Sequence, residues 1–397
     1  MVNPLTSAVA SDTFMRTVWQ RKPALIKQAL STTEINDLLR ANSTRDDAQD
    51  CLSPKTMRQL ALSDETESRL ITRRGKRWSL HHGPFEPEEL PTDKQKAWTL
   101  LIQSVDHQLE RASDLLHRFN FIPQARLDDL MISIAGDQGG VGPHLDSYDV
   151  FLLQLTGRRR WTLGKPGHYT FQQDQPVKLV TEFEPTESLE VEPGDILYVP
   201  PGWVHDGVAR GPCSTASIGF RSPNRAEFLS AWLTEQAERL HEHDPNTQYS
   251  DRRAAAQPQA WRKHPAGISD DLNTTLQNWI ANWRPDKKWD QAFIGRYLTE
   301  PKAHVWFDRP GSAASRRFAD NAKRNGVKLH RKSRISFRRQ SLFINGEAIA
   351  VQGKLPVALK SLANDRALNG AACSDIWSAY GEMLQAWFDA GWLQAKT

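Results

Sequence analysis

Cysteine is scarce in this chain, long apolar runs are missing, and neither sign of charge dominates. The three cysteines, Cys51, Cys213 and Cys373, are odd in number and far apart in the sequence. They argue against a disulfide framework or a cysteine-rich metal site and favour a reducing compartment. No apolar run approaches the ~20 residues of a membrane-spanning helix, and the first residues lack the basic and apolar regions of a signal peptide. These absences predict a cytoplasmic protein.

The charge balance is mild, with one local exception. The chain carries 51 basic and 47 acidic residues, a net charge of +4, which by itself does not indicate nucleic-acid binding. One stretch, residues 323–339, contains no acidic residue and eight basic ones: Lys323, Arg324, Lys328, Arg331, Lys332, Arg334, Arg338 and Arg339. This run is either a solvated basic hairpin or a patch that makes a weak contact with RNA.

Length and composition fit a globular protein with several domains. The chain has 397 residues, of which 39% are hydrophobic and 25% charged, and this is enough for two or three domains. We expect four segments in order: a helical and loop extension over residues 1–90, a strand-rich domain over 91–225, a helical region over 226–300, and a winged-helix-like domain over 301–397.

Two helical signals come before the strand-rich region. Ser31 and Glu34 have the spacing of a capping box ahead of an apolar-periodic segment, which predicts the start of a helix. Residues 98–119 are expected to form one long amphipathic helix. The reason is that apolar side chains recur near helical spacing at Leu101, Val105, Leu109 and Leu116.

From Arg126 onward the apolar period changes to two, which is the period of a half-buried strand. Over residues 126–134 the alternation puts Leu130, Ile132 and Ile134 on one face. The other face then carries Asp129, Met131 and Ser133.

Several more short strands are expected in the same region. Thr156-Gly157 is interpreted as a turn between a strand over 148–155 and a returning strand over 158–163. Further strand signals lie at 188–191, 196–199 and 214–220. Many short strands separated by turns indicate an antiparallel barrel of the jelly-roll or cupin type, that is, a double-stranded β-helix.

The C-terminal part combines helices with a hairpin. Asn345-Gly346 is a strong tight-turn pair between strand-like segments. Residues 245–268 have the composition of a loop or linker. Helices are expected at 225–241, 270–283, 291–298, 356–364 and 374–388. A small hairpin beside helices predicts a winged-helix-like module, which binds nucleic acid in some proteins and docks proteins in others.

The most informative motif is His144-Leu145-Asp146, followed at a distance by His205. Residues i and i+2 of a strand point to the same side, so His144 and Asp146 project together. His205 follows an apolar strand and the Pro200-Pro201-Gly202 turn, which can bring it alongside. Two histidines and one carboxylate form the facial triad of non-haem Fe(II) oxygenases, which leaves coordination positions open.

A facial-triad oxygenase needs an electron-donating co-substrate, and 2-oxoglutarate requires a cation for its far carboxylate. Arg159 suits a bidentate pairing with that group, provided that Arg159 and Trp161 face inward while Arg158 and Arg160 face outward. The alternative is a solvated arginine at a sheet edge. Additional hydroxyl donors to the co-substrate are expected from neighbouring strands: Ser133, and either Thr215 or Ser217.

With these residues in view, the sequence resembles the bacterial ribosomal oxygenases of the JmjC class, which include the arginine 3-hydroxylase of the sixteenth large-subunit ribosomal protein. The resemblance covers residues ~10–235 and is carried by these segments: Trp19–Pro23, His82–Phe85, Asp128–Ser133, Gly140–Phe151, Thr156–Trp161, Glu192–Tyr198 and Gly219–Asn224. The chain departs from the pattern at Asp137, an acid that not all members share, and in its C-terminal third.

The resemblance implies roles for eight residues. His144, Asp146 and His205 match the iron ligands of the family, Arg159 and Ser133 match the 2-oxoglutarate contacts, and three residues match the pocket for the substrate arginine: Asp129, Met131 and Tyr148. It further implies a JmjC barrel over 91–225, a helical dimerisation region over 226–300 that forms a homodimer, and a C-terminal winged helix over 301–397.

The function implied is that of an Fe(II)- and 2-oxoglutarate-dependent dioxygenase. It would use O2 to hydroxylate C3 of an arginine in a ribosomal protein and would release succinate and CO2. A carboxylate at Asp129 favours a cationic side chain as substrate. The alternatives are a histidyl hydroxylase of another ribosomal protein, a non-catalytic cupin-like protein that binds the ribosome, and a DNA-binding regulator built on the C-terminal module.

Overall fold

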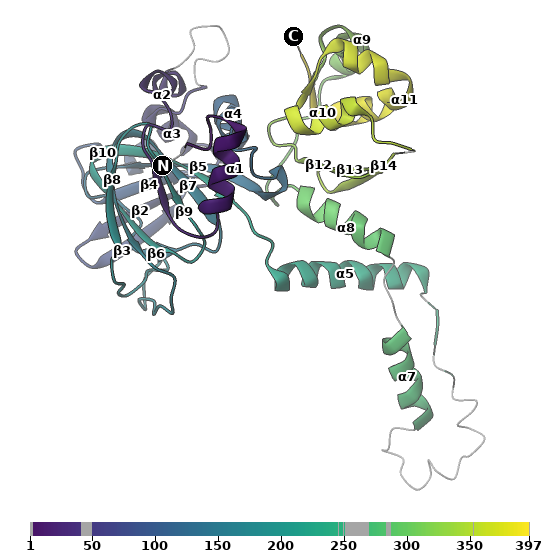
Figure 1. Ribbon diagram of the computed structural model, residues 1–397, viewed down its shortest axis with the longest axis horizontal. Helices are drawn as coiled ribbons and strands as arrows, with labels where there is room; N and C mark the ends of the chain where they lie inside the picture. Colours follow the sequence, from purple (N-terminus) through teal and green to yellow (C-terminus); the bar gives the residue numbers. More distant parts are fainter. Residues whose placement is uncertain are drawn as a thin grey trace. The chain divides into compact units, whose positions relative to one another are not determined.

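The computed structural model shown in Figure 1 describes residues 3–40, 50–244, 246–248, 250, 270–282, 287–351 and 353–396. The chain divides into two compact units. The first contains Met1–Ser222, Val305–Ser333 and Asn369–Thr397, and the second contains Pro223–His304 and Arg334–Leu368. No helix in the described parts of the chain combines the length and the apolar character that a membrane span requires.

A ten-stranded sheet of antiparallel pairs forms the body of the first unit. The strands follow the order β1-β9-β7-β10-β5-β4-β2-β3, with β6 also paired to β10 and β8 to β7. Their bounds are β1 Ala24–Ile26, β2 Ser68–Arg74, β3 Arg77–His82, β4 Trp98–Ile102, β5 Leu127–Ala135, β6 His144–Leu145, β7 Asp149–Gly164, β8 Glu187–Val191, β9 Ile196–Val199 and β10 Val204–Phe220. This antiparallel body confirms the predicted fold class.

Helices near the N-terminus cover one face of this sheet. They are α1 Ala8–Thr17, α2 Thr32–Leu39, α3 Pro54–Leu60 and α4 Glu110–His117, with the short 3-10 turns η1 Pro87–Glu89, η2 Val105–His107 and η3 Gln124–Arg126. The capping box predicted at Ser31 and Glu34 is present at the start of α2. Phe14 of α1 packs against the rings of Phe151 and Tyr198, with centroids 5.5 and 5.2 Å apart.

Strand β5 shows how the sequence pattern assigns the two faces of the sheet. Leu130, Ile132 and Ile134 are 2% exposed or less and belong to the core under the helices. The alternate residues, among them Met131 and Ser133, face the opposite side and line a cavity. The predicted alternation is confirmed, because a strand with one face in a core must present its other residues to the opposite face.

The prediction of one helix over residues 98–119 is wrong. Its first part is strand β4, whose five side chains are all buried and which pairs with β2 and β5. A short apolar run buried on both faces of a sheet cannot be told from a buried helix by periodicity alone. Ser104, with a φ of 47°, separates β4 from η2, and only Glu110–His117 is an α-helix.

The predicted turn at Thr156-Gly157 is also wrong. Residues 149–164 form one strand, β7, which pairs with β10 on both sides of that dipeptide. The pairing shifts register between Ser214 and its neighbours on β10, and Gly157 has a φ of 62°. The dipeptide therefore marks an irregularity within a strand rather than the end of one.

The first unit also contains a helical part from the C-terminal third. It consists of α9 Ser312–Asn325, β11 Val327–Leu329, α11 Gly370–Asp389 and β16 Leu393–Ala395. Phe318 of α9 stacks on Phe388 of α11 with ring centroids 4.1 Å apart. Arg331 donates a hydrogen bond of 2.6 Å to the carbonyl of His107, which ties this part to the η2 turn beside the sheet.

The second unit consists of helices and a three-stranded meander. Its elements are α5 Arg225–His243, α7 Asp270–Asn282, α8 Lys287–Thr299, β12 Ile335–Arg338, β13 Ser341–Ile344, β14 Glu347–Ala350, α10 Val357–Asp365 and β15 Ala367–Leu368. Asn345 and Gly346, with φ of 47° and 85°, connect β13 to β14, so the predicted tight turn is confirmed. The linker expected at 245–268 lies, apart from residues 246–248 and 250, outside the described residues.

The basic run at 323–339 is not one hairpin. Lys323 and Arg324 end α9, Lys328 lies in β11, and Arg338 ends β12. The run passes from the first unit to the second between residues 333 and 334. Its interpretation as a single solvated hairpin is therefore wrong, and its charges are distributed over several elements.

Candidate active site

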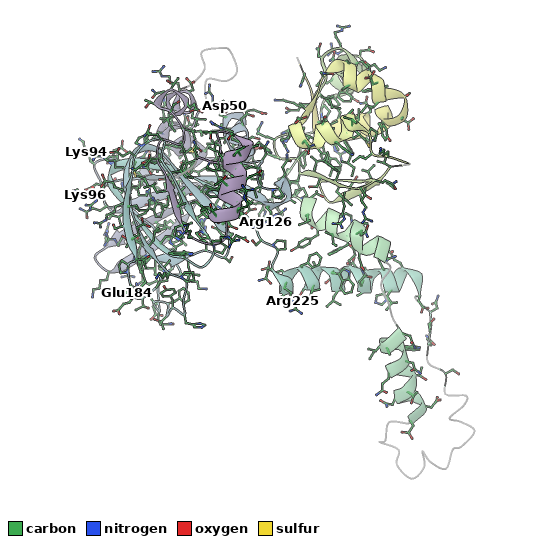
Figure 2. All side chains as sticks on the ribbon, viewed as in Figure 1. Asp50, Lys94, Lys96, Arg126, Glu184 and Arg225 are labelled. Carbon is green, nitrogen blue, oxygen red and sulfur yellow. The ribbon has the colours of Figure 1, made fainter. Side chains whose placement is uncertain are left out.

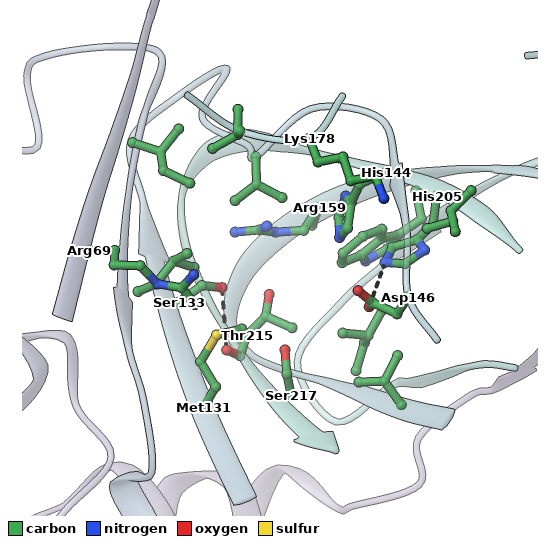
Figure 3. A pocket seen from close by; sticks show the side chains of 18 of the residues that line it. Arg69, Met131, Ser133, His144, Asp146, Arg159, Lys178, His205, Thr215 and Ser217 are labelled. Carbon is green, nitrogen blue, oxygen red and sulfur yellow. Dashed lines mark hydrogen bonds and ion pairs between the residues drawn. The ribbon is translucent and has the colours of Figure 1, made fainter. Parts of the chain in front are cut away.

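The three candidate metal ligands meet where β6 pairs with β10. His144 and His205 are directly opposite each other in this antiparallel pair, and Asp146 is the residue immediately after β6. One ligand atom from each side chain lies within 4.8 Å of the others. The Nε2 atom of His205 is 3.6 Å from Oδ2 of Asp146. The structure thus brings together the three residues that the spacing singled out (Figure 3).

Backbone carbonyls orient both imidazole rings. The Nδ1 atom of His144 is 2.8 Å from the carbonyl oxygen of Gly142, and that of His205 is 3.1 Å from the carbonyl oxygen of Trp203. A carbonyl can only accept, so each Nδ1 carries the hydrogen and each Nε2 keeps its lone pair. Metal-binding histidines usually donate such a hydrogen bond from the ring nitrogen that does not bind the metal, which fixes the orientation of the ring.

The electrostatics of the site favour a neutral imidazole at His205. Burial and, to a smaller extent, the neighbouring His144 lower the pKa of His205 to about 4, against a partial opposite effect of Asp146. A neutral ring is the form that binds metal. Two imidazoles and one carboxylate match the donor set of non-haem iron(II), so the residues present fit that ion.

A cavity of about 300 Å³ opens beside the triad. Its wall is built mainly by β2, β4, β5, β7 and β10, with two residues from the segment between β7 and β8. The residues that line it include His144, Asp146 and His205 at one end, Arg159, Trp161, Ser133, Thr215 and Ser217 along the wall, and Arg69, Met131, Tyr148, Val177 and Lys178. Figure 3 shows most of these side chains pointing into the cavity.

Arg159 is a buried cation without a carboxylate partner among the described residues. The side chain is 3% exposed, its Nε has no hydrogen-bond partner, and one Nη atom is 3.6 Å from the sulfur of Cys213. Arg158 and Arg160 on the same strand are exposed, as the predicted alternation requires. A buried, unpaired guanidinium is costly unless an anion binds it, and a dicarboxylate such as 2-oxoglutarate fits this need.

Hydroxyl groups lie on the two strands that form the adjacent wall. Ser133 and Thr215 are directly opposite each other in the β5–β10 pair. The Ser133 hydroxyl is 3.4 Å from the carbonyl of Thr215, and the Thr215 hydroxyl donates to Gln154 at 2.9 Å. Both side chains line the cavity, so the structure places the predicted hydroxyl donors on the same cavity as Arg159.

The three residues expected in the substrate pocket take different positions. Met131 and Tyr148 line the cavity, and Asp129 does not. The Asp129 carboxylate accepts a 3.0 Å hydrogen bond from the Ser104 hydroxyl. It nevertheless acts on Tyr148. Burial raises the pKa of Tyr148 above its ordinary value, and the carboxylates of Asp146, Asp129 and Asp128 raise it further, against a smaller opposite effect of Arg69. The surroundings of Tyr148 are therefore acidic.

Two parts of the chain match known protein families. Residues 114–228 match the JmjC domain family, and residues 284–394 match the ROXA-like winged helix family. The chain is 34% identical over 290 residues to the Ribosomal protein uL16 3-hydroxylase of Escherichia coli, covering 71% of this chain and 70% of that protein. The chain belongs to the JmjC ribosomal oxygenases.

Solved structures of the family agree with the fold over nearly the whole chain. The X-ray structure of Escherichia coli YcfD superposes with a TM-score of 0.78 at 29% identity, covering 96% of this chain and 97% of that chain. YcfD in complex with cobalt and 2-oxoglutarate gives a TM-score of 0.76 at 29% identity, covering 97% of each chain. This JmjC ribosomal oxygenase therefore has the predicted cupin-type barrel and C-terminal winged helix, and it is an iron(II)- and 2-oxoglutarate-dependent enzyme.

Sequence reasoning missed two cations that line the cavity of this oxygenase, Arg69 and Lys178. Arg69 comes from β2, in a segment where only helices and loops were expected. Lys178 lies between β7 and β8, with its ammonium 4.5 Å from the ring centroid of Phe171. The alternation within Ser68–Arg74 indicates a strand, but it does not indicate which strand β2 pairs with. Whether Arg69 reaches the cavity depends on that long-range pairing.

Proposed function

We propose that this oxygenase hydroxylates C3, the β-carbon, of an arginine in the large-subunit ribosomal protein uL16. One oxygen atom of O2 enters the arginine and the other enters succinate, while 2-oxoglutarate loses CO2. One observation carries the proposal: the facial-triad donor set and the buried, unpaired guanidinium of Arg159 share one cavity. The name of the Escherichia coli relative supports uL16 as the protein substrate.

In this proposal His144, Asp146 and His205 hold the iron, and Arg159 and Ser133 hold the co-substrate. The bound iron supplies the oxidising chemistry with O2 and 2-oxoglutarate. The chain itself positions the reactants and excludes water. Val150, Leu152 and Trp161 line the cavity beside these groups and are 5% exposed or less, which keeps bulk water from the reacting carbon.

The residues near the cavity mouth suit an arginine side chain. Tyr148 is 39% exposed and offers an aromatic face on which a guanidinium can stack. Met131 supplies a flexible apolar wall. Asp128 and Asp129 provide negative charge near the Tyr148 ring that outweighs the opposite effect of Arg69, which favours a cation over a neutral side chain. We therefore assign Asp129, Met131 and Tyr148 to the binding of the substrate arginine, with Asp129 acting through its charge.

The test is incubation of the iron-loaded protein with an arginine-containing uL16 peptide, 2-oxoglutarate and O2. Tandem mass spectrometry is expected to place one added oxygen atom on C3 of an arginine, in step with succinate release. His144→Ala is expected to abolish both products. His168→Ala is the matched control, since His168 is exposed and does not line the cavity.

Other outcomes correspond to the alternative functions. Oxygen on a histidine of a different ribosomal peptide would make the protein a histidyl hydroxylase. Metal binding without turnover of 2-oxoglutarate would indicate a non-catalytic ribosome-binding protein. Coupled turnover retained in a well-folded His144→Ala variant would refute the assignment of the iron ligands.

We also propose the location and the assembly of the enzyme. A cytoplasmic location fits a ribosomal substrate. A homodimer formed through residues 226–300 would bury apolar side chains that are exposed on α5 and α7. The large exposed apolar residues of these two helices are Leu229, Leu233, Leu240, Leu276, Trp279 and Ile280. The division into an extension over 1–90, a JmjC barrel over 91–225, a dimerisation region over 226–300 and a winged helix over 301–397 is part of this proposal.

A weak contact with RNA through the basic run is a further part of the proposal. Arg309, Lys328, Arg331 and Lys396 line one groove of the first unit, together with a single acid, Asp308. Lys328 and Arg331 also face Glu110, at 3.4 and 3.5 Å, which reduces the charge available. Binding to a short RNA that is lost as salt is raised supports this contact. Equal binding after Lys328→Glu, which reverses a charge of the run in this groove, would contradict it.

A further inference from the structure

Arg69 enters the active-site cavity from outside the strands that carry the motif. It lies in β2 and lines the cavity together with Ile71 of the same strand. Its Nε atom is buried and has no hydrogen-bond partner, and it forms no ion pair with any of the described residues. Figure 3 shows its guanidinium directed toward Ser133, in the part of the cavity toward which Arg159 points from the opposite wall.

The strand register explains how Arg69 reaches this position. Arg69 is opposite Leu101 of β4, Leu101 is opposite Ser133 of β5, and Ser133 is opposite Thr215 of β10. The four side chains therefore form one row across the sheet on the cavity face. Arg69 and Ser133 are two strand spacings apart, about 10 Å, and the Arg69 side chain spans much of this distance by passing over Leu101.

The charges that line the cavity are unbalanced. Three cations line it, Arg69, Arg159 and Lys178, against one carboxylate, Asp146, which the metal would take. Two guanidinium groups directed at the same space repel each other. The buried Nε atom of each has no hydrogen-bond partner, and neither group has a carboxylate partner among the described residues, so their desolvation is not compensated within the fold. An anion between them removes both costs, because each fork can donate to a carboxylate oxygen.

We propose that Arg69 is a second anchor for the far carboxylate of 2-oxoglutarate, acting with Arg159 and Ser133. The proposal rests on the use of 2-oxoglutarate in the proposed function. Arg69 is then a specificity-determining residue, because it raises the affinity for a dicarboxylate and not the affinity for a 2-oxo acid that lacks the second carboxylate.

The experiment measures binding, apart from activity. Protein loaded with Mn(II) in place of iron is titrated by calorimetry with 2-oxoglutarate and with 2-oxobutyrate, which has the same keto-acid group and no second carboxylate. Arg69→Met is expected to weaken 2-oxoglutarate binding at least about tenfold, the loss of a charge-assisted hydrogen bond. Its affinity for 2-oxobutyrate is expected to match that of the wild type.

Two further variants test whether weaker binding by Arg69→Met comes from the lost charge or from a general loss of structure. Arg74→Met removes a cation from the exposed end of the same strand and is expected to bind 2-oxoglutarate normally. Arg69→Lys keeps a charge with fewer donors and is expected to recover part of the affinity. In the iron enzyme, Arg69→Met is expected to raise the KM for 2-oxoglutarate and to keep kcat at saturating co-substrate.

The outcomes separate this inference from the proposed function. Equal weakening of 2-oxoglutarate and 2-oxobutyrate by Arg69→Met would mean a general loss of the site, and the inference fails. Unchanged 2-oxoglutarate affinity with a raised KM for the uL16 peptide would place Arg69 against the protein substrate, and the inference fails again. A wild type that binds 2-oxoglutarate, discriminates through Arg69 and modifies no uL16 arginine leaves the inference standing and removes the proposed substrate.

Discussion

Individual buried charges of this enzyme differ in whether the protein itself satisfies them. Asp149 is fully buried, yet it accepts hydrogen bonds from Tyr198 at 2.6 Å and Gln20 at 2.9 Å and pairs with Arg126 at 3.1 Å. Its role is complete within the fold. Arg159 is also buried and has no such partners. The absence of an internal partner distinguishes a residue that awaits a ligand from one that stabilises the fold.

His330 permits a prediction about stability at the same scale. Burial, and after it the charges of Arg331 and Lys332, lower its pKa to about 4, against smaller opposite effects of Glu110 and Asp308. The backbone N–H of Lys332 donates to its Nδ1 at 3.2 Å, a bond that needs the neutral ring. The folded state therefore disfavours protonation. The contribution of His330 to the unfolding free energy is complete above pH 6.5, the ordinary histidine value, and declines as the pH falls toward about 4.

We expect His330→Gln to flatten this pH dependence. Between pH 6.5 and 4 the wild type is expected to lose on the order of 1 kcal/mol more unfolding free energy than the variant, a figure reduced for partial exposure. Urea unfolding at several pH values measures the difference. His168→Gln, at an exposed histidine, is the control. Parallel pH profiles for wild type and His330→Gln would contradict the prediction.

How much of the site was predictable depends on the sequence separation of its residues. His144 and Asp146 are two apart, so strand alternation alone places them together. The inward direction of Met131, Ser133 and Arg159 likewise follows from alternation within one strand. Arg69 reaches the cavity because β2 pairs with β4 and β4 with β5. Strand order is a long-range property that local periodicity does not contain, so this residue was missed.

Among the elements, β7 does the most to position the site. Val150 and Leu152 line the cavity before Gly157, and Arg159 and Trp161 line it after. The cavity-lining positions change from even to odd numbers along one strand, so one extra residue is accommodated between them. Gly157, with its positive φ, lies where this change occurs. An irregularity of this kind re-aims side chains beside a functional site.

We expect Gly157→Ala to damage both stability and co-substrate binding. A Cβ at Gly157 would lie 2.2 Å from the carbonyl oxygen of Pro212, so the backbone must shift. The positive φ alone costs a non-glycine residue about 1 kcal/mol, and the clash adds to this. Because the shift moves Arg159, the affinity for 2-oxoglutarate is expected to fall as well. Urea unfolding and calorimetry on the Mn(II)-loaded protein measure the two effects.

Gly75→Ala is a matched control for this variant. Gly75 has the same φ of 62°, and a Cβ there would meet nothing within 4 Å. The control thus includes the cost of the backbone conformation and excludes the clash. If the two variants lose equal unfolding free energy and bind 2-oxoglutarate equally well, the close approach at Gly157 does not position Arg159.

The two wrong element predictions share a physical cause. Residues 98–102 and the dipeptide at 156–157 both lie in strands that pair on two sides. Burial on both faces removes the period-two signal of β4, and tertiary pairing continues β7 through a dipeptide that elsewhere ends a strand. In both places the element is decided by pairing with strands distant in the sequence, which local sequence signals do not contain.

For the molecule as a whole, the uneven distribution of exposed apolar residues needs explanation. Leu229, Leu233 and Leu240 of α5 are 40%, 55% and 48% exposed, and Ile280 of α7 is 80% exposed. The first two are four residues apart, so they share one face of the helix. Such faces are rarely left in water. A second copy is the simplest partner, because a C2 interface uses the same surface on both chains.

We expect the wild type to be a dimer, with twice the chain mass of 45.0 kDa in multi-angle light scattering. Leu233→Glu combined with Ile280→Glu is expected to shift the mass to that of one chain, because a charge cannot be buried unpaired at the interface. The single variant Val9→Glu, at a residue 75% exposed on α1, is expected to leave the dimer intact. A wild type that is monomeric at micromolar concentration, or a double variant that stays dimeric, would exclude α5 and α7 as the interface.

If the monomeric variant still binds 2-oxoglutarate like the wild type, the cavity is complete within one chain, as its lining residues indicate.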